Sequence, residues 1–372
     1  MTGGRIALDT TIAALDLAGT GSYIRSLEAA LLPILGDRLI SLRSRFAAPH
    51  VGPRTVAAMG RTLARDLWWH QAGVERRARR VGAELLHLPA AAGPVRGSLP
   101  TVITIHDLSV LHAPQLFRFW FRHYARVVIP PLARRAARVI TDSDATRCDV
   151  VEHLQVPEER VVVVPISVAE SYRPREDGSD EPATILERYH LPHQFVLSVC
   201  TLEPRKNLQR LLEAVRLLAE RPPTRDIVLV HAGAYGWMAD DVLRAAQSPA
   251  LRGRVRFLGY VAQEDVPALY RQARLLAFPS LSEGFGLPVL EAMACGCPVV
   301  TSNRSSLPEV AGDAAVLVNP ESVEAIADGI RQLWTDGSLA ADLRARGLAR
   351  ARLFSWERTA QLTADVYRAA LQ

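Results

Sequence analysis

Short apolar runs that alternate with longer helical stretches are the feature that most limits the folds open to this chain. In the first half the apolar runs cover residues 5–9, 84–88, 101–105, 138–141 and 160–164. The stretches of helical periodicity between them include residues 23–35, 59–80 and 119–137. Runs this short and this apolar are typical of strands that are buried on both faces of a parallel sheet. The pattern therefore predicts a doubly wound α/β domain.

A second series of the same kind follows a polar segment at residues 169–180 that is rich in Pro, Glu, Asp and Ser. Its apolar runs cover residues 195–199, 226–232, 255–258, 274–278, 299–302 and 315–318. Its helical stretches cover residues 208–220, 239–246, 265–272, 288–294 and 322–334. A last helical stretch, residues 356–371, has no apolar run after it.

We therefore expect two Rossmann-like domains, residues 1–180 and 181–355, with a C-terminal helix at 356–372 that packs back on the first domain. Ligands of open parallel sheets bind at the carboxyl ends of the strands. Two such sheets that face one another would leave a cleft at these ends, and we expect the functional site there.

The composition supports this reading and narrows the choice of compartment. The chain has 372 residues, enough for two hydrophobic cores, and its apolar share of 49% is ordinary for a globular protein. No stretch resembles a signal peptide, no apolar run approaches the roughly 20 residues that span a bilayer, and the four cysteines are too scattered for a disulfide framework. We therefore expect a cytoplasmic protein. The formal net charge of +5 suits an anionic ligand, a nucleic acid or an acidic membrane and does not choose among them.

The densest motif is PSLSEGFGLPVLEAMACG, which starts at Pro279 and runs from a predicted strand through a loop into a predicted helix. Gly284 and Gly286 permit a ligand to approach the backbone, and the free amides at the helix start suit an anion or sugar hydroxyls. Glu283 lies in the loop and Glu291 about one turn into the helix, so we expect separate partners for them. Carboxylates accept paired hydrogen bonds from neighbouring hydroxyls, as in a sugar or a ribose. The alternative is one carboxylate that interacts with the helix dipole and a second that is merely solvated.

The second motif is TLEPRKN, which starts at Thr201 where the first strand of the second half meets its helix. Of the 44 lysine and arginine residues in the chain, Lys206 is the only lysine, and it follows Arg205 directly. Two adjacent cations at this turn form a concentrated positive site for a diphosphate. The alternative is a solvated, capped helix start. Cations at a helix start oppose its dipole, so we expect an anionic group to compensate them.

These two motifs at this separation resemble the family 4 (formerly group 1) retaining glycosyltransferases of GT-B fold. The likeness extends to TIHDLS at 104–109, TDSDATRCDV at 141–150, GAYGW at 233–237, FLGYV at 257–261 and TSNRSSLPEVAGDAA at 301–315. It covers nearly the whole chain and is strongest toward mannosyltransferase-like members. The resemblance implies the GT-B fold, with two doubly wound Rossmann-like domains facing across a cleft.

The resemblance also implies roles for individual residues. It implies catalytic roles for His106, Arg205, Lys206 and Glu283. It implies donor binding by Gly19, Gly21, Arg205, Lys206, Glu283, Phe285, Gly286, Leu287 and Glu291. In this family pattern the Arg-Lys pair would hold the donor diphosphate and stabilise the charge that develops on the leaving group. The first glutamate would contact the transferred sugar, and the second would bind the nucleotide ribose.

Three positions depart from the family pattern. Ser22 stands where many relatives have arginine, so a contact from that side chain to the phosphates or the acceptor is in doubt. Cys200 replaces a frequent glycine, and VVPISV at 163–168 lacks the usual Asn-Gly pair.

Two short features admit a structural reading beside the functional one. His106 stands at a strand end before Asp107 and could simply cap the next segment. Asp142-Ser143-Asp144 matches the metal-binding Asp-x-Asp of the other large glycosyltransferase fold, but here it begins a predicted helix, where these residues are favoured caps. We therefore expect capping, no metal and no cofactor beyond a nucleotide-sugar co-substrate.

The expected reaction moves a hexose from a GDP- or UDP-sugar, with GDP-mannose as the expected donor, to a saccharide or lipid-linked acceptor in surface-polysaccharide or glycoconjugate synthesis. A GT-B sugar-nucleotide epimerase, a phosphorylase and a non-catalytic sugar-nucleotide binding protein are the alternatives. The basic, aromatic stretches 61–80 and 117–138 could rest on an anionic membrane or could be ordinary solvated helix faces. No motif for nucleic-acid binding is present.

Overall fold

The structure, a computed structural model, describes residues 4–15, 19–45, 64–112, 114, 119–174, 181–220, 222–236 and 239–372. Its contacts divide the chain into two compact units. Unit 1 comprises the chain up to Ile166 together with Ser355–Gln372, and unit 2 comprises Ser167–Phe354. The chain therefore passes into unit 2 before the polar segment, whereas the sequence placed the boundary after it, at residue 180.

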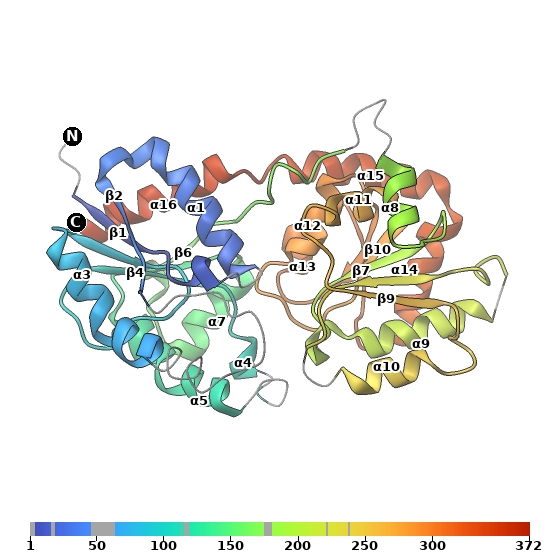
Figure 1. Ribbon diagram of the computed structural model, residues 1–372, viewed down its shortest axis with the longest axis horizontal. Coiled ribbons are helices and arrows are strands. Elements are labelled where there is room, and N and C mark those ends of the chain that lie inside the picture. The colour runs from blue at the N-terminus through green and yellow to red at the C-terminus, as the bar shows by residue number, and fades with distance from the viewer. Residues whose placement is uncertain are drawn as a thin grey trace. The chain divides into compact units, whose positions relative to one another are not determined.

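Unit 1 is built on a parallel sheet with the strand order β2-β1-β3-β4-β5-β6 (Figure 1). The strands are β1 (Ile6–Asp9), β2 (Leu39–Leu42), β3 (Leu85–Leu88), β4 (Thr101–Ile105), β5 (Arg138–Thr141) and β6 (Val161–Val163). The helices are α1 (Thr20–Leu35), α3 (Val74–Arg80), α4 (Ser109–His112), α5 (Phe119–Val127), α6 (Ile129–Arg135), α7 (Asp144–Leu154) and α16 (Trp356–Leu371). The central strands β1, β3 and β4 are buried along their whole length, as their near-continuous apolar sequences predict.

The helical stretches predicted in unit 1 differ from the structure at two places. Residues 59–80 do not form one α-helix, because Ala64–Gly73 is a π-helix that leads into α3, and residues 59–63 lie outside the described part of the chain. Residues 119–137 are divided into α5 and α6 at Val128, directly before the Ile129-Pro130-Pro131 sequence that opens α6. Proline removes a backbone donor and suits a first helical turn, which explains the new start.

Unit 2 is built on a second parallel sheet, with the strand order β12-β11-β10-β7-β8-β9. The strands are β7 (Val196–Val199), β8 (Leu229–Ala232), β9 (Val255–Gly259), β10 (Leu275–Phe278), β11 (Val299–Ser302) and β12 (Val316–Val318). The helices are α8 (Glu181–Arg188), α9 (Leu208–Ala219), α10 (Asp240–Ala246), α11 (Val266–Gln272), α12 (Leu287–Ala294), α13 (Leu307–Ala311), α14 (Val323–Thr335) and α15 (Gly337–Ala351).

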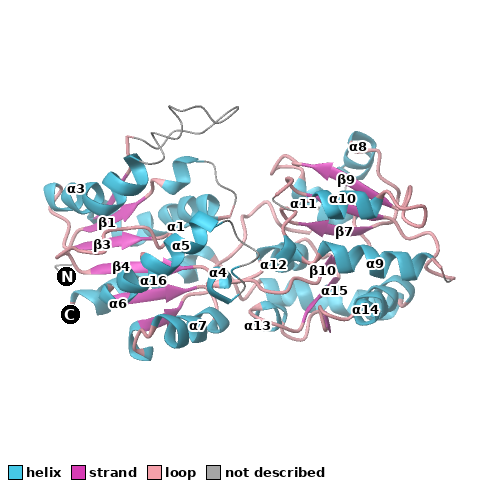
Figure 2. Cartoon of the chain, turned by 90° about the horizontal axis from the view of Figure 1, so that it is seen from below, coloured by secondary structure: helices cyan, strands magenta, loops and turns pink. Residues whose placement is uncertain are grey.

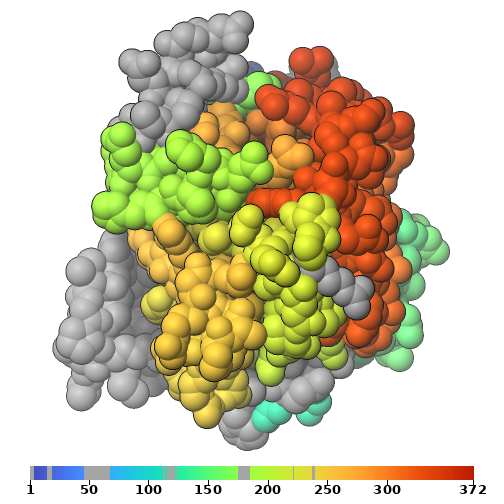
Figure 3. Space-filling view, turned by 90° about the vertical axis from the view of Figure 1, so that its right-hand side faces the viewer, coloured from blue at the N-terminus to red at the C-terminus, as the bar shows by residue number. Residues whose placement is uncertain are grey.

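Helices cover both faces of each sheet, as Figure 2 shows by colour. In unit 2, α9 packs against α14 over an apolar core that includes Leu211, Leu212, Ile326 and Ile330. On the face seen in Figure 3, the red segment that holds α14 and α15 forms one side and the light-green α8 lies toward the other. Each sheet thus has its own buried core, as two doubly wound domains require.

The C-terminal helix α16 belongs to unit 1, where it lies against α1. It buries Ala360, Ala364 and Tyr367, and the Tyr367 hydroxyl forms a 2.7 Å hydrogen bond with Nδ1 of His87 on β3. The helix therefore completes the core of the first unit although it comes last in the sequence. None of the helices in the described residues is long and apolar enough to cross a membrane.

Candidate active site

The TLEPRKN and SEGFG motifs meet at the carboxyl edge of the sheet in unit 2. They follow β7 and β10, which are neighbours in the sheet, so the topology brings two loops together that are far apart in the sequence. The Leu281 amide donates to the carbonyl of Arg205 at 2.8 Å, and the Asn207 side-chain amide donates to the carbonyl of Pro279 at 3.0 Å. Asn207 holds a left-handed backbone conformation there (φ +61°), which asparagine tolerates better than most residues.

Arg205, Lys206 and Glu283 form one ion-pair cluster at this edge. Lys206 Nζ donates to Glu283 Oε1 at 2.6 Å, and an Arg205 terminal nitrogen donates to Glu283 Oε2 at 2.9 Å. Arg205 Nε also donates to Glu203 Oε2 at 3.0 Å. The side chains of Lys206 and Glu283 are only 10% and 8% exposed, so water screens their attraction weakly. The structure thus brings together three of the residues that the sequence assigned to the donor.

The charges of this cluster explain the ionisation of Glu283. Burial alone would raise the pKa of this carboxyl, but the charges of Lys206 and Arg205 and the hydrogen bonds from Lys206 and Ser280 outweigh it and hold the pKa at about 2. Glu283 is therefore ionised at any physiological pH. The anionic compensation that the sequence predicted for the two cations comes from Glu283 and Glu203, and these four groups together carry no net formal charge.

The loop between Glu283 and α12 is fixed by the serines that precede α13. Ser306 Oγ lies within hydrogen-bond distance of the carbonyl oxygens of Glu283 and Phe285, at 2.9 and 2.8 Å, and its one proton can serve either. Ser305 Oγ donates to the Glu283 carbonyl at 2.6 Å. Gly286 then takes a left-handed conformation (φ +102°) before α12 begins at Leu287. The backbone amides of this turn start the helix, where an unpaired N–H can donate to an anion or a hydroxyl.

Glu291 lies on α12 and has different partners, as the sequence suggested for the two glutamates. The Tyr270 hydroxyl donates to Glu291 Oε2 at 2.8 Å, and the Tyr172 hydroxyl interacts with the same carboxyl. Burial raises the pKa of Glu291, although both tyrosines act in the opposite direction. Sequence reasoning did not find either tyrosine, because neither lies in a recognised motif.

In unit 1, His106 follows β4 and pairs with Asp142, which follows the neighbouring strand β5. His106 Nδ1 lies 2.6 Å from Asp142 Oδ2, and Nε2 lies 3.1 Å from the carbonyl oxygen of Pro89. A carboxylate and a carbonyl only accept hydrogen bonds, so these two contacts favour the imidazolium form of His106, which donates from both nitrogens. Burial opposes the charge, but Asp142 and the Pro89 carbonyl raise the pKa of His106 overall. The ring of Tyr23 packs edge-on against the imidazole, with 4.6 Å between the ring centroids.

The Asp142-Ser143-Asp144 sequence is therefore only partly a helix cap. Ser143 is the N-cap of α7, and its side chain accepts a hydrogen bond from the Thr146 amide, which confirms the capping role for this residue. The capping interpretation of Asp142 was wrong, because its carboxyl binds His106 instead. Asp144, in the first turn of α7, pairs with Arg147.

The two predicted glycines of unit 1 stand at the start of α1. Gly19 has a positive φ of +76° directly before the helix, a conformation that favours glycine. Gly21 is buried in the first turn, and a Cβ there would meet the Arg25 side chain at an ordinary 3.5 Å. The donor contact predicted for both glycines stays a prediction.

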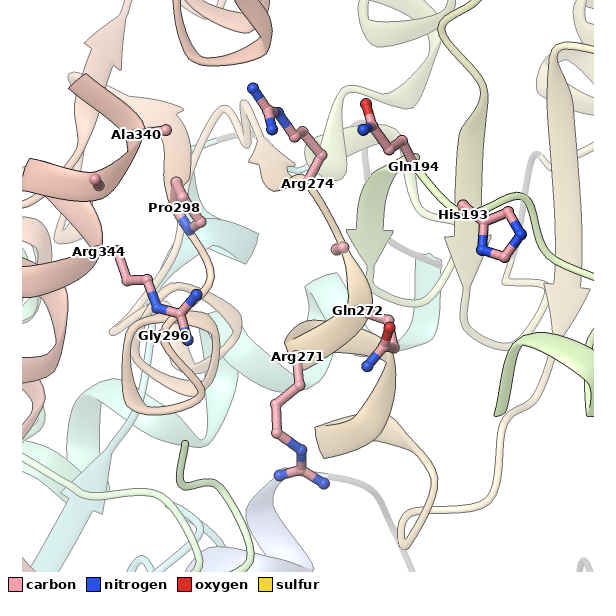
Figure 4. Close-up of a pocket in the computed structure, with 11 residues that line it drawn as sticks. His193, Gln194, Arg271, Gln272, Arg274, Gly296, Pro298, Ala340 and Arg344 are labelled. Atoms are coloured by element: carbon pink, nitrogen blue, oxygen red, sulfur yellow. The ribbon is translucent and has the colours of Figure 1, made fainter. Parts of the chain in front are cut away.

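A hollow of about 350 Å³ opens at the opposite edge of the sheet in unit 2, beside residues that precede β7, β10 and β11 (Figure 4). Arg271, Arg274 and Arg344 line it, and their guanidinium groups point in different directions. Arg274 donates to the carbonyl of Trp334 at the end of α14, and Arg271 donates to the carbonyl of Arg173. Two of the three arginines are thus already bonded to backbone carbonyl groups, and the hollow lies at the edge opposite to the carboxyl ends of the strands, where ligands of parallel sheets bind.

No group of three or more His, Cys, Asp or Glu side chains that could hold a metal ion occurs in the described ranges. The expectation that the protein needs no metal stays a prediction.

Comparison with known proteins agrees with this geometry. A family profile described as "Glycosyl transferases group 1" matches residues 190–350, and one described as "Glycosyltransferase Family 4" matches residues 39–172. An O-antigen chain mannosyltransferase B of Escherichia coli is 38% identical over 268 residues, which are 72% of this chain and 70% of that protein. A serotype-specific mannosyltransferase WbdA of the same species is 32% identical over 280 residues, but these span 73% of this chain and only 34% of WbdA.

The crystal structure of WaaG, a glycosyltransferase involved in lipopolysaccharide biosynthesis, aligns with 97% of this chain and 99% of its own. The TM-score is 0.72 at 18% sequence identity, so this likeness concerns the fold. Together with the two parallel sheets, it confirms the predicted GT-B class with two doubly wound Rossmann-like domains. The chain therefore belongs to the group 1, or family 4, glycosyltransferases.

Proposed function

We propose that this glycosyltransferase transfers a hexose, with mannose from GDP-mannose as the first choice, with retention of anomeric configuration. The proposed acceptor is a saccharide or a lipid-linked saccharide in surface-polysaccharide or glycoconjugate synthesis. The mannosyltransferases among its relatives support the choice of sugar, and the family resemblance supports retention.

The observation that carries the proposal is the Arg205–Lys206–Glu283 cluster at the start of α12. An ammonium group has three donors, and Lys206 gives one of them to Glu283, so others remain for oxygens of a diphosphate. Glu283 orients both cations, and its carboxylate would also accept hydroxyls of the transferred sugar. A nucleoside diphosphate that enters this site would bring its own negative charge to two cations that are already held in place.

The proposed mechanism needs no strong general acid, because a nucleoside diphosphate is a good leaving group. Arg205 and Lys206 would stabilise the negative charge that builds up as the bond to the sugar breaks. The departing phosphate would help to deprotonate the acceptor hydroxyl on the same face, which gives retention. The catalytic role proposed for His106 would be electrostatic, because its two nitrogens already bond to Asp142 and the Pro89 carbonyl and an imidazolium cannot act as a base.

The test begins with a thermal-shift screen of GDP- and UDP-sugars, followed by measurement of free nucleoside diphosphate. We expect release of GDP from GDP-mannose to require an added acceptor saccharide. A sugar-nucleotide epimerase would convert the donor without an acceptor, and a mere binding protein would be stabilised by the donor without any turnover. Either result would refute the transferase proposal.

Substitution of Lys206 tests the cluster directly. Removal of one preorganised charge donor costs about 10²–10³-fold in kcat in other enzymes, and we expect Lys206→Ala to lose activity on this scale. Lys206→Arg keeps the charge but not the compact ammonium and should recover only part of it. Arg43→Ala, at an exposed position in unit 1, is the control and should remain near wild-type activity. Equal activity of the Lys206 and Arg43 variants would remove Lys206 from the site.

Contact with an anionic membrane is a separate proposal that rests on the basic, aromatic stretches 61–80 and 117–138. Trp68 is 48% exposed, whereas its neighbour Trp69 is buried and its Nε1 donates to Asp9 at 3.3 Å. Trp69 is thus buried in the structure of unit 1, whereas Trp68 is partly exposed on its surface. Co-sedimentation with liposomes of anionic and neutral lipid tests this contact, and equal binding to both would refute it.

A further inference from the structure

The two glutamates of the proposed donor site differ in the charge of their partners. Glu283 is bonded by two cations, but within the described residues no lysine or arginine forms an ion pair with Glu291. The partners that the structure gives Glu291 are two neutral phenols, which bring no positive charge to its carboxyl group. A partly buried carboxylate in such surroundings gains free energy from any further donor that reaches it.

The main partner, Tyr270, is placed by the fold so that its hydroxyl meets this carboxyl. It lies on α11, which packs against α12, and its side chain is fully buried. Its hydroxyl donates to Glu291 Oε2 at 2.8 Å. Glu291 itself is only partly buried, so its carboxyl is not sealed in the core as the Tyr270 ring is. The tyrosine therefore holds a carboxylate that can still be reached.

The second partner, Tyr172, comes from the segment with which the chain enters unit 2. Its ring packs against that of Tyr270 with 6.1 Å between the ring centroids, and its hydroxyl interacts with the Glu291 carboxyl. The segment is fixed on both sides of this residue. Ser167 Oγ donates to the carbonyl of Phe354 at 3.0 Å, and Arg271 donates to the carbonyl of Arg173 at 3.0 Å. These contacts fix the position of Tyr172 beside α11 and α12.

We propose that Tyr270 and Tyr172 are positioning residues that aim the Glu291 carboxylate at the two adjacent hydroxyls of a ribose. A carboxylate offers about four lone-pair positions, so two phenols leave room for a pair of hydroxyl donors. The phenols fix the rotation of the carboxyl group without neutralising it, whereas an arginine would fix it and remove the charge that attracts the diol. This inference rests on the proposed function, because it assumes that the nucleotide ribose lies at Glu291.

The experiment compares nucleotides with and without the ribose hydroxyls. The affinity of GDP and of 2′,3′-dideoxy-GDP is measured by calorimetry for the wild type, Tyr270→Phe, Tyr172→Phe and the double variant, and UDP with its dideoxy form is measured in parallel. A hydrogen bond to a charged group contributes enough free energy for about a tenfold change in affinity. We expect Tyr270→Phe to lower the affinity for GDP about tenfold and Tyr172→Phe to lower it less. The affinity for dideoxy-GDP should be unchanged in both variants.

The matched control is Tyr189→Phe, which removes a phenol that donates to Asp265 at 2.7 Å, outside the proposed site in the same unit. It should leave the affinities for GDP and dideoxy-GDP unchanged. Equal weakening of GDP and dideoxy-GDP by Tyr270→Phe would mean a general structural role and would overturn the inference, as would no weakening of either.

The same measurements separate this inference from the proposed function. If the wild type binds neither GDP nor UDP, the proposed donor site itself fails. If GDP binding depends on Lys206 but not on the tyrosines, the donor site stands and only their positioning role is lost. Melting temperatures of all variants, recorded alongside, show whether each has folded.

Discussion

Three carboxylates near the proposed chemistry show how their partners set their properties. Glu283 is paired with Lys206 and Arg205, and its pKa is lowered to about 2. The partners of Glu291 among the described residues are phenols, and its pKa is raised, mainly by burial. Asp142 bonds to His106 and favours the protonated form of that imidazole. The residue type alone does not decide which of these roles a carboxylate takes.

The pairing of Glu283 predicts a measurable dependence of stability on pH. The folded pKa lies below the usual 4.5, so the stabilisation is complete above the unfolded pKa and is lost as the pH falls toward about 2. The free energy of unfolding of the wild type should exceed that of Glu283→Gln by a margin that shrinks by about 1 kcal/mol as the pH falls from about 5.5 to about 3.5. Urea unfolding measures this margin. Glu213→Gln, which removes a half-exposed partner of Arg216, should show no such trend. A constant difference for Glu283→Gln would contradict the assigned ionisation.

For the His106–Asp142 pair, the dependence of folding stability on pH has the opposite sign. The folded pKa of His106 is raised, so its stabilisation is complete below the unfolded pKa of about 6.5 and is lost as the pH rises through the folded pKa. Asp142→Asn removes the charge that favours the imidazolium and should lower the pKa of His106 by about one pH unit or more. Titration of the histidine ring signals by NMR measures it. The alkaline limb of the activity profile should move to lower pH in the variant, and an unmoved limb would exclude a role for the His106 proton.

Local sequence could identify Lys206, Arg205 and Glu283 because they lie in two dense motifs directly after apolar runs. The geometry of a parallel sheet then brings the ends of neighbouring strands together. Tyr270 and Tyr172 could not be found in this way, because each reaches Glu291 from a different element and neither has a distinctive sequence around it. The pairing of His106 with Asp142 was missed for the same reason, since it depends on β4 and β5 being neighbours.

At the scale of elements, the strands were easier to predict than the helices. The residues of β4, β5 and β11 were predicted with their observed bounds, because these strands are rich in β-branched residues and are almost fully buried. Strand β2 was missed, since it lies at the sheet edge and is only partly buried, with Ser41 exposed. Helix α15 was also missed, because it opens with Gly-Ser and buries few of its residues.

The start of α12 depends on Gly286, and this gives a prediction at the same scale. An alanine there would need the left-handed conformation and would place its Cβ 2.6 Å from Leu307 Cδ2. We expect Gly286→Ala to cost about 2–3 kcal/mol of unfolding free energy and to weaken nucleotide binding. Urea unfolding and calorimetry measure the two effects.

Leu307→Ala separates the two causes of that cost. It removes the close contact but not the backbone strain, so the double variant should be more stable than the sum of the single effects predicts. Gly337→Ala is the control, because a Cβ there meets nothing within 4 Å. Simple additivity of the Gly286 and Leu307 variants would show that the close contact does not contribute.

At the scale of the whole molecule, the two units have separate cores and the last helix completes the first unit. Sequence alone predicted two α/β domains and a helix that packs back. It did not predict that the chain enters unit 2 at Ser167, because the polar residues there give no sign of the contacts that Ser167 and Tyr172 make. Regions with separate cores can open separately, since each loses its own buried apolar contacts.

A single change in α16 should therefore destabilise unit 1 and leave the stability of unit 2 unchanged. Ala360 is fully buried, and an aspartate there would place an unpaired charge in the unit 1 core, at a cost of about 3 kcal/mol or more. In hydrogen exchange followed by mass spectrometry, we expect Ala360→Asp to remove protection from β1, β3 and β4 while β7 and β10 keep theirs. Arg368→Ala, on the exposed side of the same helix, should change neither unit. Equal loss of protection in both units would show that they fold as one cooperative body, and no loss in unit 1 would show that α16 is not needed for its core.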